Sequence, residues 1–323
     1  MFLRFHVPSL DAKHVIILIV VFKKELKVKV NIEKNTPTLM VVPIIILMVF
    51  ITIIPLIYVL GISFTDSTLA QSFQNFIGFS NYKQAFHDSD LRYSILNTFW
   101  FAFVVSIVET FLGFILAYSV IKIESKRTAA ILSTLSLFPL FTPPVAAAMV
   151  WRLIYDPNSG LINYYMFSKW GIFSKVYAFL GENNLAMPSI MLTDIWQWTP
   201  FCFVLSLSIL QLLPKEPYES ADVDGASPWQ VFRRLTLPMV TPNMIIVFLF
   251  KFLISFKVFD LVYILTYGGP GRKTQVLSFY IFRTVFKIFK PGYGGALSII
   301  VLIVISVVAM LILNLQKFAI KKE

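Results

Sequence analysis

Six long apolar stretches divide this chain, and they limit its fold more than any other feature. A helix needs about 20 mostly apolar residues to cross the hydrocarbon core of a bilayer. The stretches that meet this requirement are 38–64, 94–121, 129–151, 186–212, 243–265 and 293–316. Only 14% of the residues are charged, whereas soluble domains carry about a quarter. The sequence therefore predicts an all-α polytopic membrane protein with six core transmembrane helices.

The segment 1–37, ahead of the first stretch, is basic and suggests no clear role. Its apolar part, 14–22, is too short to span a bilayer, and the run KKELKVKV follows it without a small-residue cleavage site. We interpret 1–37 as a cytoplasmic or interfacial segment, with an additional partial span as the alternative. The membrane domain is then 38–316, and 317–323 forms a short cytoplasmic tail.

The basic residues indicate how the chain is oriented. A net charge of +11 would raise the question of nucleic acid in a soluble protein, but here lysine and arginine mostly flank apolar stretches, so we expect lipid contact and no nucleic-acid partner. With the N-terminus inside, the larger share of these residues falls on the cytoplasmic side. This bias predicts that both termini and the loop 213–242 are cytoplasmic.

The chain lacks the sequence patterns of the common catalytic and metal sites. There is no GxxxxGK[ST], no GxGxxG after a strand and no HExxH, and the three histidines are scattered. One cysteine allows no intramolecular disulfide and no thiolate metal cluster. We therefore predict no catalytic residue, no metal site and no cofactor in this chain. A membrane enzyme would need a clustered polar site, which the sequence does not offer.

The loop 213–242 is polar and carries clear helix signals. Glu219 and Ala221 stand in a short helix that Gly225 breaks, and Ser227 followed by Pro228 is a typical helix start. Pro238 is expected to stop the second helix. The loop thus reads as two short helices joined by a glycine hinge, although an ordinary solvated loop is the simpler alternative.

The spacing in this loop resembles a known motif. Glu219-Ser220-Ala221, three residues, Gly225, nine residues and Leu235-Thr236-Leu237-Pro238 resemble the EAA motif, with serine and leucine as mild departures. That motif marks the permease subunits of bacterial binding-protein-dependent ABC importers. The stretches FIGFSNYKQAF, LNTFWFAF and FDLVYILTYGGPGRKTQVLSFYIFRTVF are similar to sugar permeases of the MalF type. The resemblance covers roughly residues 38–316.

The resemblance implies a type I ABC importer fold in the inner membrane and a set of partners. These are a second, MalG-like permease, a homodimeric ABC ATPase that carries ATP and Mg²⁺, and a periplasmic or extracellular sugar-binding protein that delivers an oligosaccharide. The cytoplasmic loop would be the coupling helix, docked in a groove of the ATPase. The residues that match the motif and would make this contact are Glu219, Ser220, Ala221, Gly225, Leu237 and Pro238.

Two stretches within the spans suggest a substrate path. TDIWQWTPF combines an acid, an amide and two tryptophans in the fourth span, and amides with aromatic rings suit sugars. In the fifth span, Lys251, Ser255, Val258 and Val262 would share one helix face. By resemblance, the path is lined by Gln197, Trp198, Phe201, Cys202, Lys251, Ile254, Ser255 and Val258. The alternative is that the tryptophans anchor at the interface and the face packs on the partner permease.

Lys251 is expected near the middle of its span without an acidic residue three or four positions away. A lone ammonium there costs about 2.5–3.5 kcal/mol, so something must compensate it. An acid on the other permease, water or an anionic substrate such as a uronate oligosaccharide are the alternatives. An ion-driven secondary transporter remains the rival class, but it would need internal repeats and paired intramembrane carboxylates, and only Glu109, Asp194 and Asp260 are present without a repeat.

Overall fold

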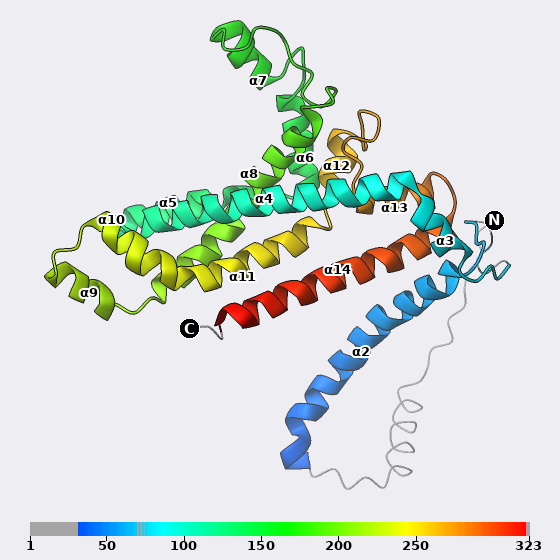
Figure 1. Cartoon of the computed structure of the whole chain (residues 1–323), viewed down its shortest axis with the longest axis horizontal. Coiled ribbons are helices and arrows are strands. Elements are labelled where there is room, and N and C mark those ends of the chain that lie inside the picture. The colour runs from blue at the N-terminus through cyan, green and yellow to red at the C-terminus, as the bar shows by residue number, and fades with distance from the viewer. Residues whose placement is uncertain (1–31, 70, 72, 74, 321–323) are drawn as a thin grey trace, which may run out of the picture. The chain divides into compact units, whose positions relative to one another are not determined.

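The computed structural model describes residues 32–69, 71, 73 and 75–320, and this part of the chain is built of helices without a strand (Figure 1). Most of the basic N-terminal segment (1–31) and the end of the predicted tail (321–323) lie outside the described residues. The chain forms two compact units, 1–58 and 59–323. The first contributes most of α2 (Ile32–Ser63), where large apolar side chains between Val41 and Tyr58 are exposed, as expected of a span.

Five helical stretches in the described residues are long and apolar enough to cross a membrane. They are 41–63 of α2, α4 (Ser89–Ile121), α8 (Ala186–Gln211), the continuous stretch Pro228–Ser255 and 291–311 of α14 (Pro291–Ile320). A bent helix pair supplies a sixth crossing if its two parts form one span. The predicted helical membrane protein is therefore confirmed, with corrections at the third and fifth spans.

The third span, predicted as one helix over 129–151, is broken. α5 (Lys126–Ser136) and the short helix η1 (Phe138–Phe141) meet α6 (Pro144–Ile154) at an angle of 92°. Thr142 and Pro143 at the break are extended, with ψ angles of 123° and 137°. Proline disfavours helical backbone in the residue before it, so Pro143 and Pro144 end one helix and start the next.

The fifth span, predicted as one helix over 243–265, is also interrupted. α11 (Leu237–Ser255) ends before a non-helical connection, and α12 (Asp260–Leu265) follows. The Ser278 hydroxyl donates to the carbonyl of Val258 in this connection, which satisfies backbone that the helix no longer pairs. The shared face predicted for Lys251, Ser255, Val258 and Val262 is therefore wrong, because only Lys251 and Ser255 lie on one helix.

Helix α4 is central to the packing of the second unit. It packs along α8 more extensively than any other pair of elements, and it also contacts α11 and α13 (Leu277–Phe286). At Gly113 the two backbones meet, because a Cβ atom there would lie 2.6 Å from the Phe203 nitrogen. Small residues allow such close approach in membranes, where packing rather than water exclusion joins helices.

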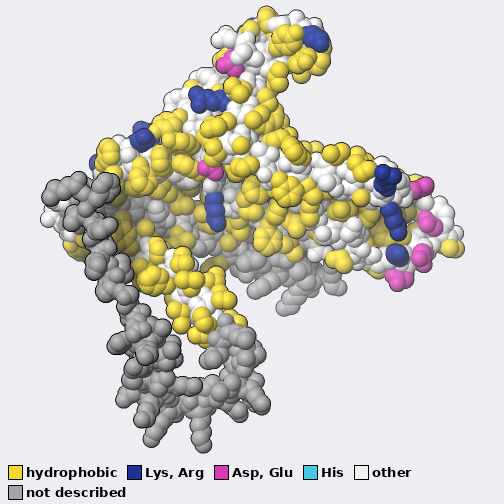
Figure 2. Space-filling view, turned by 180° about the vertical axis from the view of Figure 1, so that it is seen from behind, with side chains coloured by type: hydrophobic (Ala, Val, Ile, Leu, Met, Phe, Trp, Pro, Cys, Tyr) yellow, Lys and Arg dark blue, Asp and Glu magenta, His cyan; other side chains and the backbone are white. Residues whose placement is uncertain are grey.

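The predicted coupling loop contains α9 (Glu216–Val223), α10 (Pro228–Val231) and the wide turn η3 (Phe232–Thr236). Pro238 does not stop the second helix, contrary to prediction, because η3 leads directly into α11 and the helical stretch runs on to Ser255. The wide turn lies just before a residue that cannot donate to a helix ladder. Apolar side chains cover the long flank of the helices, and charged ones gather at the end formed by α9 and α10 (Figure 2).

The remaining described elements are short and connect the long helices. They are α3 (Ser80–His87), α7 (Leu161–Asn163) and the wide turn η2 (Tyr164–Lys169).

Candidate functional site

A buried ionic cluster joins three of the long helices. The Nζ atom of Lys251 on α11 lies 2.9 Å from Oδ2 of Asp194 on α8 and 3.1 Å from Oε2 of Glu109 on α4. It also donates to the Ser255 hydroxyl at 2.9 Å. Lys251 and Glu109 have no exposed surface, and Asp194 is 4% exposed. The sequence analysis offered an acid on a second permease, water or an anionic substrate as the compensating group, whereas in the structure two acids of the same chain, on distant helices, compensate Lys251.

The cluster has an aromatic neighbour and a carboxylate excess. The Lys251 ammonium lies 4.9 Å from the centre of the Trp198 ring, which is within range of a cation–π contact. Glu109 makes an ion pair without hydrogen-bond geometry, and within the described residues neither of its oxygens has a hydrogen-bond donor. Two carboxyl groups thus share one ammonium. A buried arrangement of this kind keeps its charges only because each offsets the desolvation of the other.

A cavity of about 320 Å³ opens beside this cluster. Its wall comes from the broken third span, from α8, from the end of α11 and from the connection to α12. The lining residues are Pro144, Asp194, Gln197, Trp198, Lys251, Ile254, Ser255, Lys257, Val258, Phe259, Asp260 and Leu261. Both helix breaks therefore contribute to one cavity. Irregular backbone inside a membrane protein is tolerated where it lines a cavity or is buried in protein.

Six of the eight residues predicted for the substrate path line this cavity, namely Gln197, Trp198, Lys251, Ile254, Ser255 and Val258. The other two do not. Phe201 packs edge-on against Trp198, with ring centres 6.0 Å apart, and so supports the wall from behind. Cys202 is fully buried and lies 4.0 Å from the Thr110 hydroxyl, where α8 meets α4.

Gln197 links the cavity to the break in the third span. Its Nε2 donates to the carbonyl of Thr142 at 2.9 Å, the carbonyl that the Pro143–Pro144 break removes from the helix ladder. Its Oε1 is buried, and no described residue donates to it. The Gln197 side chain was predicted to bind substrate. In the structure its amide nitrogen already donates to a backbone carbonyl, so only its oxygen lacks a partner among the described residues.

Glu109 was noticed in the sequence only as an isolated intramembrane acid, and Asp194 as an intramembrane acid and a member of the stretch TDIWQWTPF, but neither was paired with Lys251. Their pairing with Lys251 spans 142 and 57 residues of sequence, so no local spacing rule reveals it. The signal was the presence of acids and a base within apolar stretches, since such groups usually pair with one another.

Four of the six residues predicted to contact an ATPase lie on α9 and in the turn that follows it. Glu219 and Ser220 are exposed on α9, and Gly225 follows it with φ of 69°. The Ala226 amide donates to the Ala221 carbonyl across this turn at 3.0 Å, in the pattern of a glycine-terminated helix. Leu237 and Pro238 lie beyond it, at the start of α11.

Two large apolar side chains project from this polar segment. Val223 is 88% exposed and Trp229 is 66% exposed. The segment is nevertheless well ordered by its own contacts. Ser227 and Gln230 form a reciprocal capping box, and the Tyr218 hydroxyl donates to Thr236 at 3.1 Å, which ties α9 to the turn below α11. An ordered segment with exposed apolar side chains suits a protein partner.

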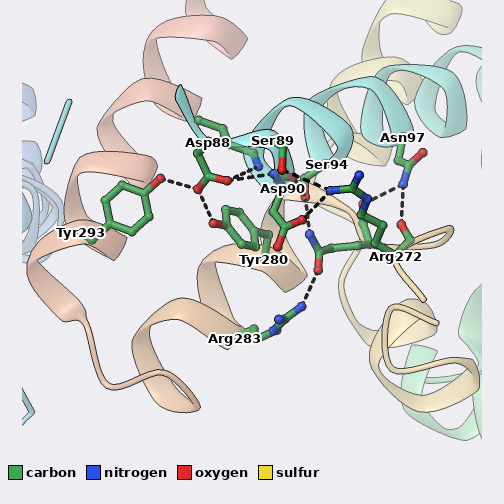
Figure 3. A network of polar contacts seen from close by, with 11 residues as sticks. Asp88, Ser89, Asp90, Ser94, Asn97, Arg272, Tyr280, Arg283 and Tyr293 are labelled. Atoms are coloured by element: carbon green, nitrogen blue, oxygen red, sulfur yellow. Dashed lines mark hydrogen bonds and ion pairs between the residues drawn. The ribbon is translucent and has the colours of Figure 1, made fainter. Parts of the chain in front are cut away.

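A polar network fixes the opposite end of α4 (Figure 3). Asp88 caps α4 and accepts hydrogen bonds from the hydroxyls of Tyr280 and Tyr293. Burial alone would raise the pKa of Asp88, but these hydroxyls and the backbone amides of α4 together hold it below its usual value. The network thus stabilises the ionised carboxylate.

The same end of α4 is tied to the loop between α12 and α13. Arg272 pairs with Asp90 at 2.8 Å (Figure 3). The Arg272 guanidinium also lies 3.7 Å from the centre of the Tyr93 ring. Gln275 donates to Ser94, and Asn97 donates to the Arg272 carbonyl. These contacts give the glycine-containing loop a fixed position beside α4.

Comparisons with known proteins consistently find membrane components of transport systems. Residues 109–322 match the family model described as "Binding-protein-dependent transport system inner membrane component". The "Trehalose/maltose transport system permease protein MalF" of Thermococcus litoralis is 30% identical over 88% of this chain and 95% of its own length. A probable ABC transporter permease of Sinorhizobium fredii is 32% identical over 90% of this chain and 93% of its own.

A solved structure has the same fold. A chain of a bacterial ABC transporter involved in the import of the acidic polysaccharide alginate superposes with a TM-score of 0.78 at 22% identity, over 89% of this chain and 97% of that one. At this identity the similarity shows the fold, which is that of an importer membrane subunit.

Proposed function

Because this chain belongs to the family of binding-protein-dependent transport system inner membrane components, we propose that it is one membrane subunit of an ATP-driven oligosaccharide importer. The proposal includes a second homologous permease, two ATPase subunits that bind ATP and Mg²⁺, and a sugar-binding protein on the outer face. The chain itself hydrolyses nothing. It lies in the cytoplasmic membrane with both termini in the cytoplasm.

The observation that carries this proposal is one continuous helical stretch that joins the α9–α10 segment to the cavity. Pro228–Ser255 is 28 residues long, which is roughly 42 Å at 1.5 Å per residue. Trp229 at one end is exposed, and Lys251 and Ser255 at the other end line the cavity. A displacement of α10 by a partner is therefore delivered to the residues around the cavity.

The partner that moves α10 is proposed to be the ATPase. Glu219 offers a carboxylate to basic groups, Val223 and Trp229 offer apolar contacts, and Gly225 leaves open space beside the turn. ATP binding must favour the outward-facing state over the inward-facing one, and turning a 1:99 population into 99:1 takes about 5.5 kcal/mol. Docking only in the closed ATPase dimer would provide this difference.

The sugar itself is proposed to pass through the cavity at the two helix breaks. The Trp198 and Phe259 rings offer apolar faces, and the Asp194 and Gln197 side chains offer polar groups. A trehalose and maltose permease among the relatives supports an oligosaccharide of this general kind. The charge of the sugar does not follow from Lys251, since that residue is paired.

The test is reconstitution of the complete complex. We expect affinity-tagged chain to co-purify with a second permease and an ATPase, and proteoliposomes to take up an oligosaccharide when the binding protein and ATP are supplied. A partner ATPase with a hydrolysis-blocking substitution should remove uptake. Transport by this chain alone, driven by an ion gradient, would contradict the proposal and favour a secondary transporter.

A further inference from the structure

The ammonium of Lys251 is already paired within the chain. Its ammonium has three protons, and it faces Asp194 at 2.9 Å, Ser255 at 2.9 Å and Glu109 at 3.1 Å, with the Trp198 ring beside it. Its side chain is 1% exposed. Two of the three protons are donated to Asp194 and Ser255, and Glu109 pairs with the ammonium as a charge, so the buried Lys251 is already compensated within the chain, although it is part of the cavity wall.

Hydrogen-bond acceptors, in contrast, remain free on the same wall. Lys251 bonds to Oδ2 of Asp194, and no residue in the described part of the chain donates to Oδ1. The Oε1 atom of Gln197, one helical turn away on α8, is buried and likewise has no donor among those residues. An acceptor on a cavity wall that lacks a donor favours a ligand that brings hydroxyl groups.

The charges around the cavity do not add up to an anion site. Asp194 and Asp260 balance Lys251 and Lys257 in the lining, and Glu109 lies behind Lys251 as a further carboxyl group. Lys257 is exposed, so water and salt screen its charge. A carboxylate on a ligand would bring only acceptors to the free acceptor of Asp194.

We propose that this cavity selects uncharged, hydroxyl-rich sugars over acidic ones, with Oδ1 of Asp194 accepting a sugar hydroxyl. In this arrangement Lys251 and Glu109 are positioning residues. Lys251 orients Asp194 through the hydrogen bond to its Oδ2, and Glu109 pairs with Lys251. The inference depends on the proposed function, because it assigns the chemical class of the sugar that passes through the same cavity.

The test is equilibrium dialysis with the purified complex of permeases and ATPases. The sugar-binding protein is left out, because its own preference among sugars would otherwise affect the result. The probes are tritiated trehalose, maltose and maltotriose as neutral sugars, and digalacturonate and trigalacturonate as acidic ones. We expect the best neutral sugar to bind at least about tenfold more tightly than the best acidic one. Equal or tighter binding of an acidic sugar, or no binding of any neutral sugar, overturns the inference.

Two matched variants assign the role of Asp194. Asp194→Asn and Glu109→Gln each remove one carboxylate from the same ammonium, but only Asp194 lines the cavity. Asp194→Asn should weaken neutral-sugar binding about tenfold, as expected for one charge-assisted hydrogen bond, and reduce the preference over acidic sugars. Glu109→Gln should keep that preference. Equal effects of the two variants would refute the role of Asp194.

The preference of the wild-type complex for neutral over acidic sugars tests the selectivity even if Asp194→Asn fails to assemble. The two proposals also fail in different ways. Uptake of an acidic sugar in proteoliposomes together with tight binding of that sugar overturns the selectivity but leaves the importer intact. Failure of the complex to assemble with an ATPase overturns the importer itself.

Discussion

At Lys251, one ammonium holds together helices that are distant in the sequence. Asp194 and Glu109 approach it from α8 and α4, and both carboxyl groups are buried. Removing one member of such a group leaves the others desolvated without their counter-charge, which costs more than the pair contributes while intact. The cluster therefore makes the packing of α4, α8 and α11 depend on a single side chain.

The first prediction concerns this dependence. Lys251→Met should lower the free energy of unfolding by about 3–5 kcal/mol, because it leaves two buried carboxyl groups facing each other. Lys257→Met removes an exposed lysine from the adjoining connection and should change stability by less than about 0.5 kcal/mol. Thermal unfolding of the purified complex in detergent measures both. Equal unfolding midpoints for the two variants would show that the cluster is not structural.

The second prediction concerns Asp88 and pH. The pKa of Asp88 is held below its usual value of 3.8, so its ionised form stabilises the fold. This stabilisation is complete above pH 3.8 and is lost as the pH falls through the lower, folded-state pKa. Asp88→Asn should therefore be less stable than wild type at pH 7, although asparagine still caps α4.

The difference between Asp88→Asn and wild type should shrink once the pH is well below 3.8, because both side chains are then uncharged. Thermal midpoints measured at pH 7 and at successively lower pH, down to about pH 2, test this. Tyr280→Phe, which removes one hydroxyl donor to the carboxylate, should show the same trend with a smaller difference. A difference that stays constant with pH would mean that the network does not favour the ionised form.

Among the elements, apolar length predicted where helices cross but not where they break. The spans at α4 and α8 were predicted to within a few residues, apart from the polar first turn of α4, since hydropathy measures a lipid-compatible stretch directly. The breaks at 142–143 and 256–259 lie inside apolar stretches, where hydropathy does not change. Pro143 and Pro144 gave a readable signal for the first break, whereas the connection at the second is bonded by Ser278 of another helix, a contact that no local pattern shows.

The candidate site was predicted in part for a related reason. Residue types that suit a sugar, such as Trp198 and Gln197, were visible in the sequence, and the structure places both on the cavity. Their partners were not visible. The Gln197 contact with Thr142 depends on a carbonyl that becomes free only because the third span breaks, and the Lys251 contacts depend on the packing of three helices.

The third prediction concerns the turn between α9 and α10. Gly225 has φ of 69°, so Gly225→Ala should cost about 1–2 kcal/mol of backbone strain. Gly171→Ala is a matched control, because Gly171 also has a positive φ, 62°, and similarly open surroundings. Gly171 follows η2 and lies outside the α9–α10 segment. We expect both variants to lose similar stability, while only Gly225→Ala strongly reduces ATP-driven uptake.

The comparison of these two glycines separates strain from coupling. If α10 carries the movement of the ATPase, a changed turn misorients Trp229 and with it the helical stretch that leads to Ser255. Sugar binding by the solubilised complex should be retained in both variants, since neither residue lines the cavity. Equal uptake by the two variants would contradict a coupling role for this segment.

At the scale of the whole molecule, the side of the membrane on which α9 and α10 lie depends on how many times the chain crosses the membrane. The described residues provide five spanning helical stretches and one pair, 126–141 with 144–154, that is bent by 92°. If this pair crosses, the segment 122–127 and the turn 155–160 lie on opposite sides, and the α9–α10 segment faces the cytoplasm together with both termini. If the pair enters and leaves on one side, the loops after it exchange sides, and α9 and α10 cannot reach a cytoplasmic ATPase unless the N-terminal part is inverted.

The last prediction decides between these two arrangements. Cys202, the single native cysteine, is fully buried, so a membrane-impermeant maleimide should report only on introduced cysteines. Glu124→Cys and Asn158→Cys place exposed thiols on either side of the bent pair without removing a helix cap. We expect Asn158→Cys to be labelled in intact cells from which any outer barrier has been removed, and Glu124→Cys only in inverted vesicles. Labelling of both from the same side would show that the bent pair is a re-entrant loop, and α9 and α10 would then lie on the opposite side of the membrane from the N-terminus.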